Sequence, residues 1–265
     1  MEWYAAYLTL GVLAGLMAGM FGVGGGTILV PVFLFLFDAQ HFPAEHSMHL
    51  ALGSAMATII FTSLASMRKH HQHNAVNWRV VRNITPGILI GATIGAQLAT
   101  AIPTRGLGIF FACFVYFAAA QILINKPPHA TRQLPGRVGM TLAGTLTGGL
   151  SSLVSIGGGT IVTPFLLWCN VPMRNAIGTS AAIGFPVALG GTAGYIATGL
   201  HIQGLPGASL GFIYLPALFW TAAASVFTAP LGAKAAHKMN IDVLRKLFAL
   251  LLLSLATKLL FKVLS

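Results

Sequence analysis

The chain has 265 residues, of which 56% are hydrophobic and only 7% are charged, and its formal net charge is +11. A soluble globular protein has about a quarter of its residues charged, so the composition excludes that class. Seven intervals contain no Asp, Glu, Lys or Arg, and each can cross the ~30 Å of bilayer hydrocarbon. They are residues 3–37, 47–67, 83–104, 106–125, 138–173, 175–200 and 202–233. The sequence therefore predicts an all-α polytopic membrane protein.

The positive charge is typical of cytoplasmic loops, where Lys and Arg meet anionic lipid headgroups. Nucleic-acid binding would need a basic domain outside the membrane, and the sequence predicts none. The expected partners are membrane lipid and no nucleic acid, and nothing indicates a homo-oligomer. Cys113 and Cys169 lie in apolar segments without CxxC spacing, which predicts neither a disulfide nor a metal site.

The first apolar interval is too long for one spanning helix. A continuous helix over residues 3–37 would measure about 52 Å, against ~30 Å of hydrocarbon. Gly22-Val23-Gly24-Gly25-Gly26 stands in its middle, and glycine in a helix interior costs about 1 kcal/mol. We expect a helix that enters the membrane, unwinds at residues 22–26 and returns as a half-helix over residues 27–37.

The chain contains this segment twice. Gly157-Gly158-Gly159-Thr160 repeats Gly24-Gly25-Gly26-Thr27 after 133 positions, and Pro164 repeats Pro31. Further matches follow, so we expect an N-terminal repeat over residues 1–125, a cytoplasmic linker over 126–136 and a C-terminal repeat over 137–265.

The charge pattern predicts how the two repeats are related. Eleven of the 15 Lys and Arg residues lie in segments 68–82, 126–137 and 234–246, which should be cytoplasmic. Segment 68–82 corresponds in the second repeat to residues 200–204, which carry none. Equivalent loops with opposite content of Lys and Arg predict inverted repeats, as in many transporters. Each repeat should have one re-entrant hairpin and three spanning helices, with both termini outside.

The duplicated motif Gly-x-x-x-Gly…Gly-x-Gly-Gly-Gly-Thr-(Ile/Leu)-x-x-Pro, followed by Ala-(Leu/Ile)-Gly-(Ser/Thr), resembles that of the TauE/SafE sulfite exporter family, also called TSUP. Residues 11–31 with 51–54, and 144–164 with 176–179, match it over nearly the full chain. The copies differ where Ser155 replaces Gly22. The resemblance implies a bacterial or archaeal cytoplasmic-membrane permease for sulfite, organosulfonates or related small anions.

Each glycine break predicts an anion site. A helix that begins after Gly26 or Gly159 leaves its first N–H groups unpaired, with about half a positive charge at that end. Thr27 and Thr160 could add hydroxyl donors or cap the helices. The hydroxyls of the later motif could bind the substrate or bond back to their own helix. The candidate substrate ligands are Gly24, Gly25, Gly26, Thr27, Ser54, Gly157, Gly158, Gly159, Thr160, Thr179 and Ser180.

His49 and Arg174 occupy equivalent positions in the two repeats. His49 could couple transport to protons or contact the anion. Arg174 could draw anions to the entrance or reach the lipid headgroups.

Other functions remain as alternatives. No Lys follows the glycines as in a phosphate loop, and no Asp or Glu lies in a predicted span, so we expect no enzyme, catalytic residue, cofactor or metal. The histidines of segment 70–73 stand among Lys and Arg in what should be a solvated loop. A channel-like pore for a small neutral solute and a non-transporting membrane scaffold remain open.

Overall fold

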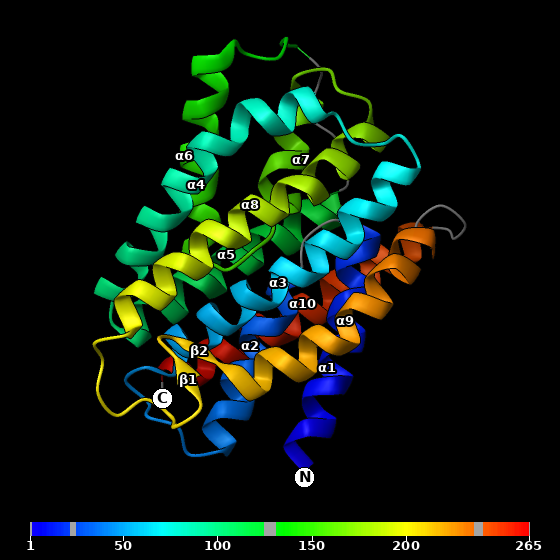
Figure 1. The fold of residues 1–265 in the computed structure, drawn as a ribbon. Helices are drawn as coiled ribbons and strands as arrows, with labels where there is room; N and C mark the ends of the chain where they lie inside the picture. Colours follow the sequence, from blue (N-terminus) through cyan, green and yellow to red (C-terminus); the bar gives the residue numbers. More distant parts are fainter. Residues whose placement is uncertain (1, 22–24, 125–130, 236–240, 265) are drawn as a thin grey trace.

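The computed structural model shows a bundle of helices that run through the molecule in both directions (Figure 1). It describes residues 2–21, 25–124, 131–235 and 241–264, with the backbone alone for residues 2, 21 and 241–245.

The first half of the chain forms helices α1 to α5 and the second half forms α6 to α10. Their bounds are α1 Glu2–Phe21, α2 Gly26–Ala39, α3 Ser47–Gln72, α4 Trp78–Ala101, α5 Thr104–Ile124, α6 Arg137–Leu153, α7 Gly159–Trp168, α8 Met173–Gly199, α9 Leu215–Ala235 and α10 Ile241–Leu264. Two short strands, β1 Ser209–Leu210 and β2 Ile213–Tyr214, form an antiparallel hairpin between α8 and α9.

The membrane class is confirmed, because seven of these helices are long and apolar enough to span a bilayer: α1, α3, α4, α5, α8, α9 and α10. Helices α2 and α7, with 14 and 10 residues, are shorter than the ~20 residues a span needs.

Both predicted glycine breaks are present. Helix α1 ends at Phe21 and α2 begins at Gly26, while α6 ends at Leu153 and α7 begins at Gly159. The chain turns sharply in both places, since Gly25 has a φ of +78° and Ser155 a φ of +44°. Glycine adopts such left-handed backbone freely, whereas it costs a residue with a Cβ roughly 1–2 kcal/mol.

One expectation for the loops is wrong, and one loop element has no counterpart among the expectations. Residues 68–72 continue α3 rather than forming a loop, because Arg, Lys and Gln are good helix formers, and the chain turns only at Asn74, whose φ is +53°. The hairpin between α8 and α9 was not predicted either. Its strands have two residues each, too few for a periodic pattern.

Most helices pack against a helix from the other half of the chain. Helix α1 packs on α9 and α6 packs on α4, while α3 contacts α9 and α8 contacts α4. Two further pairs join equivalent helices, α3 with α8 and α5 with α10. Each of these contacts made by one half therefore has a counterpart made by the other.

Glycines bring the first two pairs close together. A Cβ on Gly15 would lie 2.8 Å from the Ser225 carbonyl oxygen across the α1–α9 seam, and a Cβ on Gly95 would overlap the Gly149 carbonyl oxygen across the α4–α6 seam. Such small-residue rows allow helix backbones to approach in membranes. They leave α3 and α8, the most buried spans, at the centre.

Basic residues gather at one end of the molecule, the upper end in Figure 1, where α3 meets α4 and where α6 and α8 begin. We call this the basic end. Arg174 of α8 donates a hydrogen bond to the His73 carbonyl there, and the Arg132 N–H donates to the Trp168 carbonyl. The opposite end holds Asp38, paired with Lys262 at 2.6 Å.

Candidate functional site

The two glycine breaks meet inside the protein. A Cβ built on Gly26 would overlap the carbonyl oxygen of Ser155 and would lie 3.1 Å from Cδ1 of Ile59 on α3. The described residues of both breaks are buried. Segments that are about 130 residues apart in sequence thus form one interior site.

The first turn of α2 offers hydrogen-bond donors at this site. Gly25 is the N-cap, and its carbonyl accepts from the N–H groups of Ile28 and Leu29 at 3.1 and 3.0 Å. The N–H groups of Gly26 and Thr27 precede these and have no acceptor within the helix. The Thr27 side chain is fully buried, and its Oγ1 has no hydrogen-bond partner among the described residues.

The first turn of α7 has the same form. Gly158 is the N-cap and accepts from the Val162 N–H at 2.7 Å, so the N–H groups of Gly159 and Thr160 lack a helical acceptor. Thr160 is buried. Among the described residues, neither α2 nor α7 has a side-chain cap from its N-cap residue. Thr27 does not cap α2 within the described residues, because its Oγ1 has no partner there, while capping by Thr160 stays a prediction.

Serines at the end of α6 add polar groups that the sequence analysis missed. Ser155 donates from Oγ to the Leu52 carbonyl at 2.8 Å, while Ser151 and Ser152 are fully buried and their Oγ atoms have no partner in the described part of the chain. Tyr195 of α8 donates to the Ser152 carbonyl at 2.9 Å. The available signal was Ser151-Ser152 directly before the second break, in an otherwise apolar segment.

Ser54 and Thr179 hold the two halves together. Ser54 Oγ accepts from the Tyr214 N–H just before α9, and Thr179 Oγ1 accepts from the Asn77 N–H just before α4, both at 2.9 Å. The preceding glycines make room, since a Cβ on Gly53 or Gly178 would crowd the backbone of those same segments. Within the described residues, these hydroxyls bond neither to their own helix nor to the two breaks.

Ser180 lies closer to the second break. Its Oγ donates to the Ala176 carbonyl at 2.7 Å and accepts from Thr163 of α7 at 2.8 Å. A Cβ on Gly158 would lie 3.0 Å from the Ser180 carbonyl oxygen. Ser180 therefore borders the site, with its hydroxyl engaged in packing α7 on α8.

His49 and Arg174 lie away from the breaks. His49 is buried, and its Nε2 lies 3.3 Å from the Ala99 carbonyl oxygen and 3.1 Å from that of Ile102, so Nε2 carries the proton. Arg174 is exposed and donates to the His73 carbonyl at 2.5 Å, at the end of α3. Each side chain donates to the C-terminal end of another helix, His49 to that of α4 and Arg174 to that of α3. The last carbonyls of a helix have no partner within it and need donors.

The remaining predicted positions are Gly157, which is buried in the second break, and Gly24, which lies outside the described residues. Within the described residues no three His, Cys, Asp or Glu side chains lie close enough to hold a metal ion.

Sequence comparison identifies the group of proteins to which this architecture belongs. The family model described as sulfite exporter TauE/SafE matches residues 7–259. The chain belongs to the TauE/SafE sulfite exporter family. No solved structure matches it.

Several relatives match most of the chain. A probable membrane transporter protein of Haemophilus influenzae is 35% identical over 96% of this chain and 97% of its own length. The probable membrane transporter protein MJ0441 of Methanocaldococcus jannaschii is 25% identical over 90% and 88%. YdhB of Bacillus subtilis, with the same description, is 27% identical over 71% and 76%. The chain is accordingly a multi-pass membrane transporter of the TauE/SafE family.

Proposed function

We propose that the protein is a permease that exports a small sulfur-containing oxyanion, such as sulfite or an organosulfonate, or a similar organic anion. The observation that carries the proposal is the meeting of the two glycine breaks, each of which begins a helix in the interior. The family description, sulfite exporter TauE/SafE, supports the substrate class.

The anion would be held by donors rather than by a countercharge. An unpaired buried Lys or Arg is costly in a membrane, and the described break residues include neither. The first turns of α2 and α7 supply free N–H groups and the positive ends of two helix dipoles. Thr27, with a buried and unpartnered hydroxyl, adds a donor at the first of them.

Helix pairing supports inverted repeats. Helices of residues 1–125 pack mainly on helices of residues 137–265, and these two ranges are the proposed repeats on either side of the linker. Hairpin α1–α2 begins and ends away from the basic end, whereas α6–α7 begins and ends at it (Figure 1). The repeats would thus enter the membrane from opposite faces, and the positive-inside rule assigns the basic end to the cytoplasm and both termini to the outside.

Alternating access would require the present arrangement to open. The described residues of both breaks are buried, which corresponds to a closed state. Rocking of one repeat against the other would expose the breaks to one face at a time, as in other inverted-repeat transporters. The bacterial or archaeal cytoplasmic membrane provides an inside-negative potential, which favours outward movement of an anion by ~2.3 kcal/mol per charge per 100 mV.

The proposal is tested by flux of radiolabelled sulfite and sulfoacetate in proteoliposomes. Thr27→Val removes the hydroxyl at nearly constant volume, whereas Thr27→Ser keeps it. We expect the Val variant to lose flux and the Ser variant to retain most of it. Thr9→Val is the matched control, since Thr9 is exposed and bonds to its own helix. Equal flux in all three variants would remove Thr27 from the site.

The remaining ligands are tested separately. Gly158→Leu should abolish flux in a protein that still enters the membrane. The unaltered protein distinguishes the alternatives. If it passes neutral solutes but no anion, the pore alternative replaces the exporter. If it passes neither, the scaffold alternative does.

A further inference from the structure

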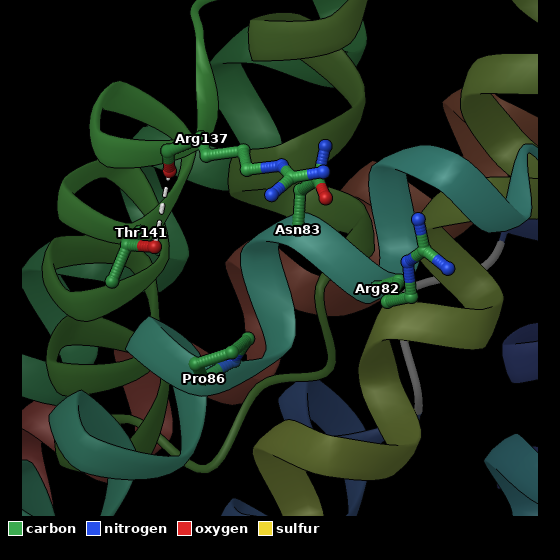
Figure 2. Close-up of a pocket in the computed structure, with 5 residues that line it drawn as sticks. All are labelled: Arg82, Asn83, Pro86, Arg137 and Thr141. Atoms are coloured by element: carbon green, nitrogen blue, oxygen red, sulfur yellow. Dashed lines mark hydrogen bonds between the residues drawn. The ribbon is translucent and has the colours of Figure 1, made fainter.

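An open cleft lies at the basic end, at the start of α4 and α6 and away from the glycine breaks. Its volume is about 420 Å³, and it is lined by Arg82, Asn83, Pro86, Arg137 and Thr141. Figure 2 shows the Arg137 guanidinium beside the Asn83 side chain, with Arg82 directly before Asn83 on the same turn of α4. The guanidinium groups of Arg82 on α4 and Arg137 on α6 thus line the same cleft.

Within the described part of the chain, no carboxylate neutralises the charge of this cleft. Neither Arg82 nor Arg137 has a hydrogen-bond or ion-pair partner for its guanidinium within residues 2–21, 25–124, 131–235 and 246–264. Asp38 pairs with Lys262 at the opposite end, and Glu45 lies in the segment that joins α2 to α3 at that end. Guanidinium groups bind phosphate through paired N–H donors, so the cleft fits an anionic phosphate group.

The position of the cleft relative to the membrane selects the source of that phosphate. Trp78, 45% exposed, lies one turn before Arg82, and exposed tryptophans mark the bilayer interface. The row of α4 that carries Arg82 and Pro86 continues as Ile90, Ile94 and Leu98, which are 48–55% exposed. The phosphate site therefore opens onto the lipid-facing surface rather than into an aqueous loop.

Helix α6 provides the second apolar wall. Val138 follows Arg137, and its row continues as Leu142 and Leu146; the three are 62–75% exposed. Acyl chains that lie along these two rows would place their headgroup at the two arginines. We propose that the cleft is a binding site for the phosphate headgroup of an anionic membrane lipid, which bridges α4 and α6 at the cytoplasmic face.

Native mass spectrometry of the purified full-length protein with dioleoylphosphatidylglycerol tests the site, with dioleoylphosphatidylcholine as the uncharged comparison. Each arginine near an anionic lipid contributes about fivefold in affinity. Arg82→Gln and Arg137→Gln should each weaken phosphatidylglycerol binding about fivefold, and the double variant about 25-fold. Arg79→Gln is the matched control, because Arg79 is an exposed arginine on α4 that does not line the cleft.

Arg82→Lys and Arg137→Lys keep the positive charge and distinguish lost lipid contacts from lost folding. Affinity should fall in the order Arg, Lys, Gln at both positions, since Lys keeps the charge without the paired donors. Unchanged binding in the Gln variants, or an equal loss in Arg79→Gln, overturns the proposal. Displacement of the lipid by an equal concentration of glycerol 1-phosphate also overturns it, because the cleft would then be a site for a soluble phosphate.

Discussion

The contact between the two breaks predicts a large effect of one methyl group. In Gly26→Ala the new Cβ would overlap the Ser155 carbonyl oxygen and would lie 2.9 Å from its carbonyl carbon. Both atoms are backbone, and Ser155 is held by its hydrogen bond to Leu52, so relief requires one break to move from the other. Overpacking of this kind costs about 1–3 kcal/mol.

Thermal unfolding of the purified protein in detergent measures this cost, and sulfite flux measures its consequence. We expect Gly26→Ala to melt at a lower temperature and to transport more slowly, because the first turn of α2 is displaced from α6–α7. Gly149→Ala is the matched control. Gly149 is a helical glycine at the α4–α6 seam whose Cβ would have only an ordinary contact, 3.5 Å from the Gly91 carbonyl oxygen. An added Cβ there should be neutral or stabilising.

The reasoning is refuted if Gly26→Ala melts and transports like the unaltered protein. It is also refuted if Gly149→Ala is destabilised to the same extent, since the effect would then report any added methyl group in the membrane.

Three further predictions concern the hydroxyls and His49. Ser54→Ala and Thr179→Ala should each cost about 1–3 kcal/mol in thermal unfolding, because each leaves a partly buried N–H without its acceptor; an effect at only one position would contradict their equivalence. Ser155→Gly should be more stable than Ser155→Ala by about 1–2 kcal/mol, because only glycine relieves the positive φ while both lose the hydroxyl; equal melting would show that the φ is not strained. His49→Phe should lower stability without changing the pH dependence of flux, because Nε2 binds the end of α4; an altered pH profile would restore a proton-coupling role.

Orientation can be tested independently of transport. Reporter fusions at Glu45, His71 and Gln203 should place His71 in the cytoplasm and the other two outside. Finding His71 and Gln203 on the same side would refute the inverted repeats.

Local features were predictable because their physical causes are local. A charge-free interval needs a membrane, and glycines within an apolar run break a helix wherever the chain is later placed. The breaks between α1 and α2 and before Gly159 were therefore predictable from the sequence, together with the first turns that follow them. The charge pattern does not predict the helical extension through Gln72, because charged residues occur in loops and in exposed helix ends alike, and Arg, Lys and Gln favour helix.

Only the tertiary structure could decide which side chains meet. Ser54 and Thr179 matched in the repeat, yet nothing local indicates that they accept from residues 160 and 102 positions away. Three further features also depend on contacts between distant segments. They are the approach of Gly26 to Ser155, the burial of Ser151 and Ser152, and the shared cleft of Arg82 and Arg137. The sequence determined where the helices break because glycine acts on its own backbone. The fold decided what the breaks face, because those partners come from the other half of the chain.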